Sequence, residues 1–183
     1  MLTPKTVPAA FSPAECDRIL ALAKTAPRRE AQLVGQQHDP SQRRATLSWL
    51  DEAEETGWVA DRLADLVRVA NRESFGFDLT EFAESAQVAE YPAATGGHFD
   101  WHADIGEGPV ARRRKLTLVV QLSDPGAYAG GALEIMPSAQ VIAAPRERGS
   151  AILFPSFLLH RVTPVTEGTR ASLTQWVHGP AFR

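Results

Sequence analysis

The stretch Lys115–Ser123 (KLTLVVQLS) decides the fold class, because its side chains alternate with the period of an extended chain. One face carries only the apolar side chains Leu116, Leu118, Val120 and Leu122. The opposite face includes Thr117 and Gln121. This pattern predicts a β-strand with one face in the core and the other toward a cavity or solvent.

Further strand-like segments follow one another from Phe77 to the C-terminus, and turn residues separate them. They are residues 86–91, 115–123, 132–136, 140–144, 150–154, 160–164 and 170–178. The turn signals are Asp124-Pro125-Gly126, Gly130-Gly131, Gly149 and Glu167-Gly168. Because no helical pattern lies between the later strands, parallel βαβ repeats are disfavoured.

The N-terminal part has a different character. Ser12 and Glu15 have the spacing of a capping box and predict the start of a helix. A second helix is expected at about 56–73, a short strand at 45–50 and a long polar loop at 28–44. We therefore expect one domain spanning 1–183 that is mainly β with flanking α-helices. Residues 1–78 would give helical support and residues 79–183 the β core.

Composition sets further bounds on the protein. The chain has 183 residues, a hydrophobic fraction of 44% and a charged fraction of 22%, as in ordinary globular proteins. The single cysteine, Cys16, cannot form an intrachain disulfide, which favours a reducing compartment. No signal peptide or membrane-spanning stretch is visible, so we expect a cytoplasmic protein without a membrane partner.

The segment Gly96–Asp104 (GGHFDWHAD) carries two histidines and two aspartates in alternation. On an extended chain all four side chains would project from the same side. One His-x-Asp pair could therefore hold a metal together with a second imidazole, for which His160 is the natural supplier. Two imidazoles and one carboxylate leave three positions open on iron(II), as an oxygenase needs for a bidentate co-substrate and dioxygen.

Arg170 adds a second element, ten residues beyond His160. The strand that it opens places Ser172, Thr174 and Trp176 on the same face as Arg170. An arginine inside such a β structure needs an anion. Its planar guanidinium suits two-point contact with a carboxylate, to which Ser172 would add a hydroxyl.

Three pieces of the sequence together resemble the prolyl-4-hydroxylase-like branch of the iron(II)/2-oxoglutarate dioxygenases. The pieces are Tyr91 with 96–104 (GGHFDWHAD), 124–133 (DPGAYAGGAL) and 160–172 (HRVTPVTEGTRAS). The likeness is close from about Ala86 to the C-terminus, and the N-terminal helices match only in general layout.

The resemblance implies a double-stranded β-helix (jelly roll) with flanking helices. It implies that His102, Asp104 and His160 hold iron(II) and that Arg170 binds the distal carboxylate of the co-substrate 2-oxoglutarate. Tyr91 would stand where the family often has a tyrosine that bonds to the co-substrate. Ascorbate is a further candidate cofactor.

The spacing alone leaves a second His-x-Asp pair open, namely His98 and Asp100. The family pattern favours His102 and Asp104, because a glycine comes about six residues before the first ligand and an aromatic residue three before it. Gly96 and Phe99 satisfy that pattern only for His102. His98 and Asp100 would then lie at the cavity mouth or face the substrate.

Other charged and aromatic residues each have two possible roles. The run Arg112–Lys115 permits binding to nucleic acid, but a formal net charge of −3 favours a solvated loop edge. Arg43 and Arg44 precede a strand, where a position facing the site and a surface ion pair both fit. Trp176 could wall the pocket or fill the core.

These observations favour an enzyme that couples oxidative decarboxylation of 2-oxoglutarate to hydroxylation of an unactivated C–H bond, with release of succinate and carbon dioxide. The substrate would be a prolyl residue, a free amino acid or another small molecule, and dioxygen would be the second substrate. One alternative is a non-catalytic jelly-roll protein that binds a metal or small anion as a sensor. Another is a zinc hydrolase with Asp100 as base, which leaves Arg170 unexplained.

Overall fold

The computed structural model describes residues 3–30, 41–51 and 53–182. In this part of the chain the helices are α1 (Pro13–Thr25) and α2 (Gly57–Ala70), with short helical turns η1 (Asn71–Phe75), η2 (Ala93–Thr95), η3 (Ala111–Arg113) and η4 (Pro125–Ala127). The strands are β1 (Lys5–Val7), β2 (Arg28–Glu30), β3 (Arg43–Arg44), β4 (Thr46–Leu50), β5 (Ala86–Pro92), β6 (His98–His102), β7 (Arg114–Gln121), β8 (Tyr128–Gly130), β9 (Leu133–Met136), β10 (Ile142–Ala143), β11 (Ala151–Pro155), β12 (Leu159–Val162) and β13 (Val165–His178).

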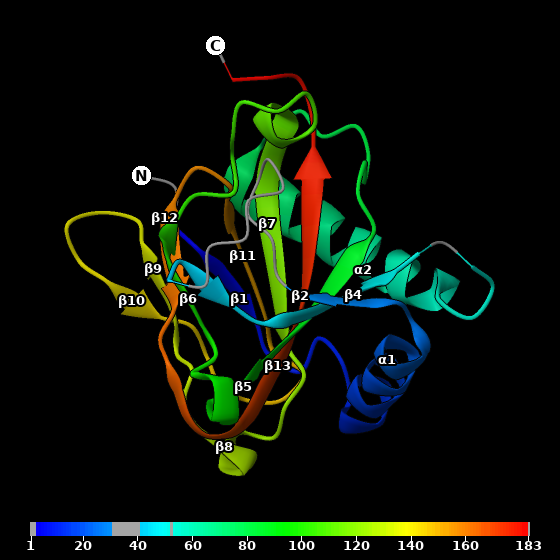
Figure 1. The fold of residues 1–183 in the computed structure, drawn as a ribbon. Coiled ribbons are helices and arrows are strands. Elements are labelled where there is room, and N and C mark those ends of the chain that lie inside the picture. Colours follow the sequence, from blue (N-terminus) through cyan, green and yellow to red (C-terminus); the bar gives the residue numbers. More distant parts are fainter. Residues whose placement is uncertain (1–2, 31–40, 52, 183) are drawn as a thin grey trace.

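The strands form two antiparallel sheets (Figure 1). The larger sheet has the order β1-β11-β7-β13-β5-β4-β2, with β8 attached to β13, and the smaller has the order β10-β9-β12-β6-β3. Neighbours in a sheet are mostly distant in sequence. The predicted fold class, mainly β with flanking helices, is confirmed.

Strand β7 shows how the sequence builds the two sides of the larger sheet. Its alternating leucines and Val120 belong to the core cluster that includes Ile19 of α1 and Leu63 of α2. Its other face carries Thr117 and Val119, which line a cavity between the two sheets. Figure 1 shows α2 running behind this sheet. The predicted division into a core face and a cavity face is therefore correct.

Both predicted helices are present. The Ser12 amide donates to the Glu15 carboxylate (2.7 Å) and the Glu15 amide donates to the Ser12 hydroxyl (3.2 Å), so the predicted capping box is formed. The second helix ends at Ala70 and continues as a π-helical turn. That turn closes at Gly76, whose φ of +64° favours glycine. No helix among the described residues has the length and apolar content that crossing a bilayer requires.

The expected long loop at 28–44 is wrong at both of its ends. Arg28–Glu30 pairs with β4, and Arg43–Arg44 pairs with β6 of the smaller sheet. These short polar strands escape a search for hydrophobic alternation, because cross-strand pairing rather than their own pattern places them. Residues 31–40 of that predicted loop lie outside the described residues. The N-terminal part thus supplies β1, β2, β3 and β4 as well as the two helices.

Candidate metal centre and co-substrate pocket

A β-bulge in β6 sets the orientation of the histidine-rich segment. His102 pairs with His160 of β12, and Phe99 pairs with Val162, so three steps along β6 match two along β12. The extra residue shifts the alternation of side chains by one position. As a result Phe99 and His102 lie on the same side, with their rings stacked at a centroid distance of 3.4 Å.

The bulge overturns the expectation that all four polar residues of this segment share one side. His98 points away from the cavity, and its two ring nitrogens face the carbonyl oxygens of Gly96 (2.8 Å) and Ser41 (2.9 Å). Asp100 is exposed, and its carboxylate accepts a hydrogen bond from the amide of Trp101. Neither side chain is among the residues that line the cavity or the adjoining cleft.

His102, Asp104 and His160 come together at the inner face of the smaller sheet. Their possible ligand atoms lie within 4.8 Å of one another. The Asp104 carboxylate is 3.6 Å from Nε2 of His102 through one oxygen and 3.5 Å from Nε2 of His160 through the other. Such converging nitrogen and oxygen donors fit a divalent metal ion.

Backbone carbonyls fix the orientation of both imidazoles. Nδ1 of His102 lies 2.7 Å from the carbonyl oxygen of Asp100, and Nδ1 of His160 lies 3.0 Å from that of Leu158. Because a carbonyl oxygen only accepts, each Nδ1 carries the proton. The lone pair of each Nε2 is then free for a metal.

The Asp104 carboxylate is held by the larger sheet. The Thr117 hydroxyl of β7 donates to it at 2.7 Å and lies 3.1 Å from the Ser156 hydroxyl. The Ser156 carbonyl accepts the amide of Asp104 at 2.9 Å. The alternation in the sequence predicts that Thr117 lies on the cavity face. Its hydrogen-bond partner, Asp104, follows β6 of the smaller sheet. No pattern within the sequence therefore indicates the hydrogen bond between Thr117 and Asp104.

The protonation states suit metal binding. Burial lowers the pKa of His160 to about 4, so its imidazole is neutral near neutral pH. Burial opposes ionisation of Asp104, but the two imidazoles and the Thr117 hydroxyl outweigh that effect and hold the pKa of the carboxyl well below its usual range. Neutral imidazole and carboxylate are the forms that bind metal ions.

Arg170 lies in the same cavity and is 1% exposed. Its Nη2 donates to the Gln121 side chain of β7 at 2.9 Å. Among the described residues, its buried Nε and Nη1 have no hydrogen-bond partner. Burial lowers the pKa of Arg170, although a guanidinium stays charged near neutral pH. Two free donors on one buried guanidinium fit a bidentate carboxylate.

The rest of the cavity follows the predicted face of β13. Arg170, Ser172, Thr174 and Trp176 all line it, as the alternation predicts. Tyr91 of β5 lines it too, and its ring centre lies 5.5 Å from the Arg170 guanidinium carbon. The cavity is narrow, at about 40 Å³. Gln121, which accepts a hydrogen bond from Arg170, lies on the face of β7 that the alternation assigns to the cavity, but nothing in the sequence marks it as a site residue.

A wider cleft of about 460 Å³ adjoins the cavity and shares His102, Asp104 and Trp176 with it. Arg114 lines this cleft and pairs with Glu84, and its Nη1 donates to the Asp104 carbonyl at 3.0 Å. The guanidinium carbon of Arg114 lies 4.0 Å from the centre of the Trp176 ring. The prediction that residues 112–115 form a solvated edge is therefore wrong for Arg114 and Lys115, each of which is 8% exposed.

Glu84 links this ion pair to His178, which lies 3.0 Å away and is fully buried. Burial opposes its ionisation, yet the hydrogen bonds from His178 and Arg114 lower the pKa of Glu84 to about 2. Glu84 therefore stays ionised and keeps Arg114 in position beside the Asp104 backbone.

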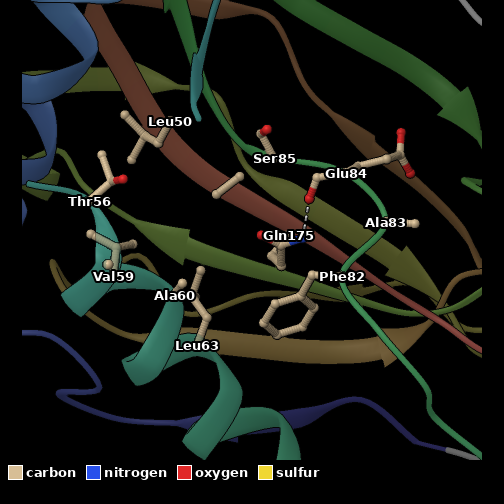
Figure 2. A pocket seen from close by; sticks show the side chains of 12 residues that line it. Leu50, Thr56, Val59, Ala60, Leu63, Phe82, Ala83, Glu84, Ser85 and Gln175 are labelled. Atoms are coloured by element: carbon tan, nitrogen blue, oxygen red, sulfur yellow. Dashed lines mark hydrogen bonds between the residues drawn. The ribbon is translucent and has the colours of Figure 1, made fainter. Parts of the chain in front are cut away.

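A separate pocket of about 310 Å³ lies between α2 and residues 82–86. Figure 2 shows its mainly apolar wall, with Val59 and Leu63 facing Phe82. The amide of Gln175 donates to the backbone carbonyl of Glu84 there. None of the three candidate metal ligands lines this pocket.

Comparison with known proteins identifies the family to which this chain belongs. A family model described as the 2OG-Fe(II) oxygenase superfamily matches residues 86–178. A PKHD-type hydroxylase of Synechococcus elongatus is 29% identical over 152 residues, covering 72% of this chain and 68% of that protein. One from Thermosynechococcus vestitus is 40% identical over 88 residues, covering 48% of this chain and 39% of that protein.

Solved structures show the same fold. A prolyl hydroxylase from Trichoplax adhaerens, in complex with a hypoxia inducible factor peptide fragment, has a TM-score of 0.80 at 18% identity, covering 97% of this chain and 84% of that one. A Pseudomonas putida prolyl-4-hydroxylase has a TM-score of 0.72 at 23% identity, covering 96% and 92%. The predicted jelly roll is thereby confirmed. The chain belongs to the 2OG-Fe(II) oxygenase superfamily and is a 2-oxoglutarate-dependent dioxygenase.

Proposed function

We propose that His102, Asp104 and His160 hold iron(II), that Arg170 binds the distal carboxylate of 2-oxoglutarate, and that the enzyme hydroxylates an unactivated C–H bond of a small-molecule or peptidyl substrate. The observation that carries this proposal is the buried Arg170 guanidinium, with two unpartnered donors in the same cavity as the three ligands. A buried cation with free donors is costly unless an anion binds to it.

The three ligand side chains, His102, Asp104 and His160, fit iron(II). Two neutral imidazoles and one carboxylate leave coordination positions open for exchangeable ligands. When bound, the iron would let dioxygen act as the oxidant, with one oxygen atom passing to 2-oxoglutarate, which yields succinate and carbon dioxide, and the other passing to the substrate C–H bond. Tyr91 and Ser172 line the narrow cavity together with Arg170, and we assign both to co-substrate binding.

The protein's own residues orient the metal ligands and exclude water from the cavity. Thr117 and the backbone carbonyl contacts keep the ligand atoms aimed at one point. The narrow cavity, at about 40 Å³, excludes bulk solvent, which would protect the reaction from side reactions. The wider cleft, which shares His102 with the narrow cavity, is the proposed substrate entrance.

Two finer assignments accompany this proposal. Strands from the N-terminal part join both sheets, which supports one oxygenase domain across 1–183. We also propose a reducing, cytoplasmic setting, since iron(II) and the free thiol of Cys16 both persist there. Ascorbate would serve as a reductant that keeps the iron in its active state.

The test is succinate formation from 2-oxoglutarate with iron(II), with and without ascorbate, in the presence of prolyl peptides or free amino acids. We expect succinate only when both the metal and 2-oxoglutarate are present, and loss of product in the variant His160→Ala. Tight metal binding without succinate under any of these conditions would instead support the non-catalytic sensor.

A further inference from the structure

Arg43 is a second arginine at the candidate site. It lies in β3 opposite Phe99 of β6, and residues directly opposite in an antiparallel pair share a face. Its side chain therefore points inward, and it lines both the narrow cavity and the wider cleft. It is 9% exposed, whereas the next residue, Arg44, lies on the outward face and is exposed.

The Arg43 side chain is held in a defined position. Its Nη2 donates to the Gln87 side chain at 2.9 Å. Its guanidinium carbon lies 4.4 Å from the centre of the Phe99 ring, which in turn stacks on His102. A single aromatic ring thus separates this cation from a proposed iron ligand.

The charge of Arg43 is unbalanced among the described residues. Glu84 pairs with Arg114, and Asp104 belongs to the metal centre. No described carboxylate forms an ion pair with Arg43, and its buried Nε has no hydrogen-bond partner. The indole N–H of Trp176, which lines the same cleft, is also buried without a partner.

Binding of iron and 2-oxoglutarate would not supply the missing anion. Two positive charges of iron(II) and the charge of Arg170 balance the dianion 2-oxoglutarate and the carboxylate of Asp104. The charge of Arg43 remains, on a side chain that is 9% exposed. A buried cation in that state requires an anionic partner.

We propose that Arg43 recognises a carboxylate of the primary substrate, which makes that substrate a small carboxylic acid, with a free amino acid as the leading class. The cleft of about 460 Å³ has the size of a small-molecule site. A carboxylate on Arg43 would leave the carbon chain of the substrate on the side toward His102. An internal prolyl residue has no carboxylate to offer there.

This inference rests on the proposed function and deepens it, so its test separates the two. Protein loaded with Mn(II), which keeps the complex from turning over, is first titrated with 2-oxoglutarate by calorimetry. Binding of 2-oxoglutarate tests the proposed function alone. The loaded complex is then titrated with the proteinogenic L-amino acids, with their primary amides, and with a prolyl peptide blocked at both ends.

We expect at least one amino acid to bind about tenfold or more tightly than its amide, which is the contribution of a charged hydrogen bond. In Arg43→Met this preference should disappear while the affinity for 2-oxoglutarate is retained. Arg43→Lys, which keeps the charge without the fork, should retain part of it. Arg44→Met is the matched control, because it removes the neighbouring outward charge, and it should keep the full preference.

Three results would overturn the inference while 2-oxoglutarate still binds. In the first, no amino acid binds to the loaded complex. In the second, each acid binds no better than its amide, or the blocked prolyl peptide binds best. In the third, Arg43→Met retains the preference. Retained 2-oxoglutarate affinity in Arg43→Met shows that its cavity is folded, so a lost preference cannot come from unfolding.

Discussion

Replacement of Arg170 by methionine is the most informative perturbation of this protein. The side chain offers two buried donors without partners and a third that is held by Gln121. A hydrogen bond to a charged group contributes about 1.5 to 3 kcal/mol, so two of them would give 2-oxoglutarate about 3 to 6 kcal/mol. We therefore expect Arg170→Met to weaken co-substrate binding by roughly a hundredfold or more.

The same substitution should have little effect on the stability of the cofactor-free protein. Removing a buried cation with two unsatisfied donors relieves a penalty, while the Gln121 side chain loses its partner at a cost of about 1 to 3 kcal/mol. These effects oppose each other, so the free energy of unfolding should stay within about 2 kcal/mol of the wild-type value. Arg170 is 1% exposed, a position at which most substitutions are damaging.

Two measurements on the same samples check this reasoning. Calorimetry with Mn(II)-loaded protein gives the affinity for 2-oxoglutarate, and urea unfolding of the metal-free protein gives its stability. Arg170→Lys is the control for charge without the planar fork and should show an intermediate loss of affinity. Less than tenfold weakening in Arg170→Met, or a large fall in its stability, would refute the assignment.

Three further predictions concern the metal centre and its surroundings. Thr117→Val removes the hydroxyl that donates to Asp104 and should weaken Mn(II) binding about 10- to 100-fold, measured by calorimetry; unchanged affinity would show that the contact is dispensable. His102→Ala should abolish Mn(II) binding and His98→Ala should leave it nearly intact, and the reverse order would mean that the other His-x-Asp pair holds the metal. The depressed pKa of Glu84, about 2 against 4.5, predicts about 3 kcal/mol of stability at neutral pH, which is lost as the pH falls from about 4.5 to 2. Urea unfolding of Glu84→Gln should thus show its full deficit near neutral pH and almost none near pH 2; a deficit independent of pH would contradict the ion-pair explanation.

The strongly alternating parts of the fold were predictable from the sequence. The leucine face of 115–123, the arginine face of 170–176 and the capping box at Ser12 are local patterns, and each has the predicted outcome. Local patterns suffice there because side-chain period and cap chemistry depend only on neighbouring residues. The short strands β2 and β3 have no such pattern, since their place depends on the strands beside them.

By itself, the sequence determined the fold class and a short set of candidate site residues: His98, Asp100, His102, Asp104, His160 and Arg170. Only the tertiary structure decided which way they face. The bulge in β6 turns His98 and Asp100 away from the cavity, because one extra residue reverses the alternation on which the sequence argument relied. Long-range pairing likewise buries Arg43 beside Phe99, two residues that are far apart in the chain. No local pattern could show that this charge has no ion-pair partner among the described residues.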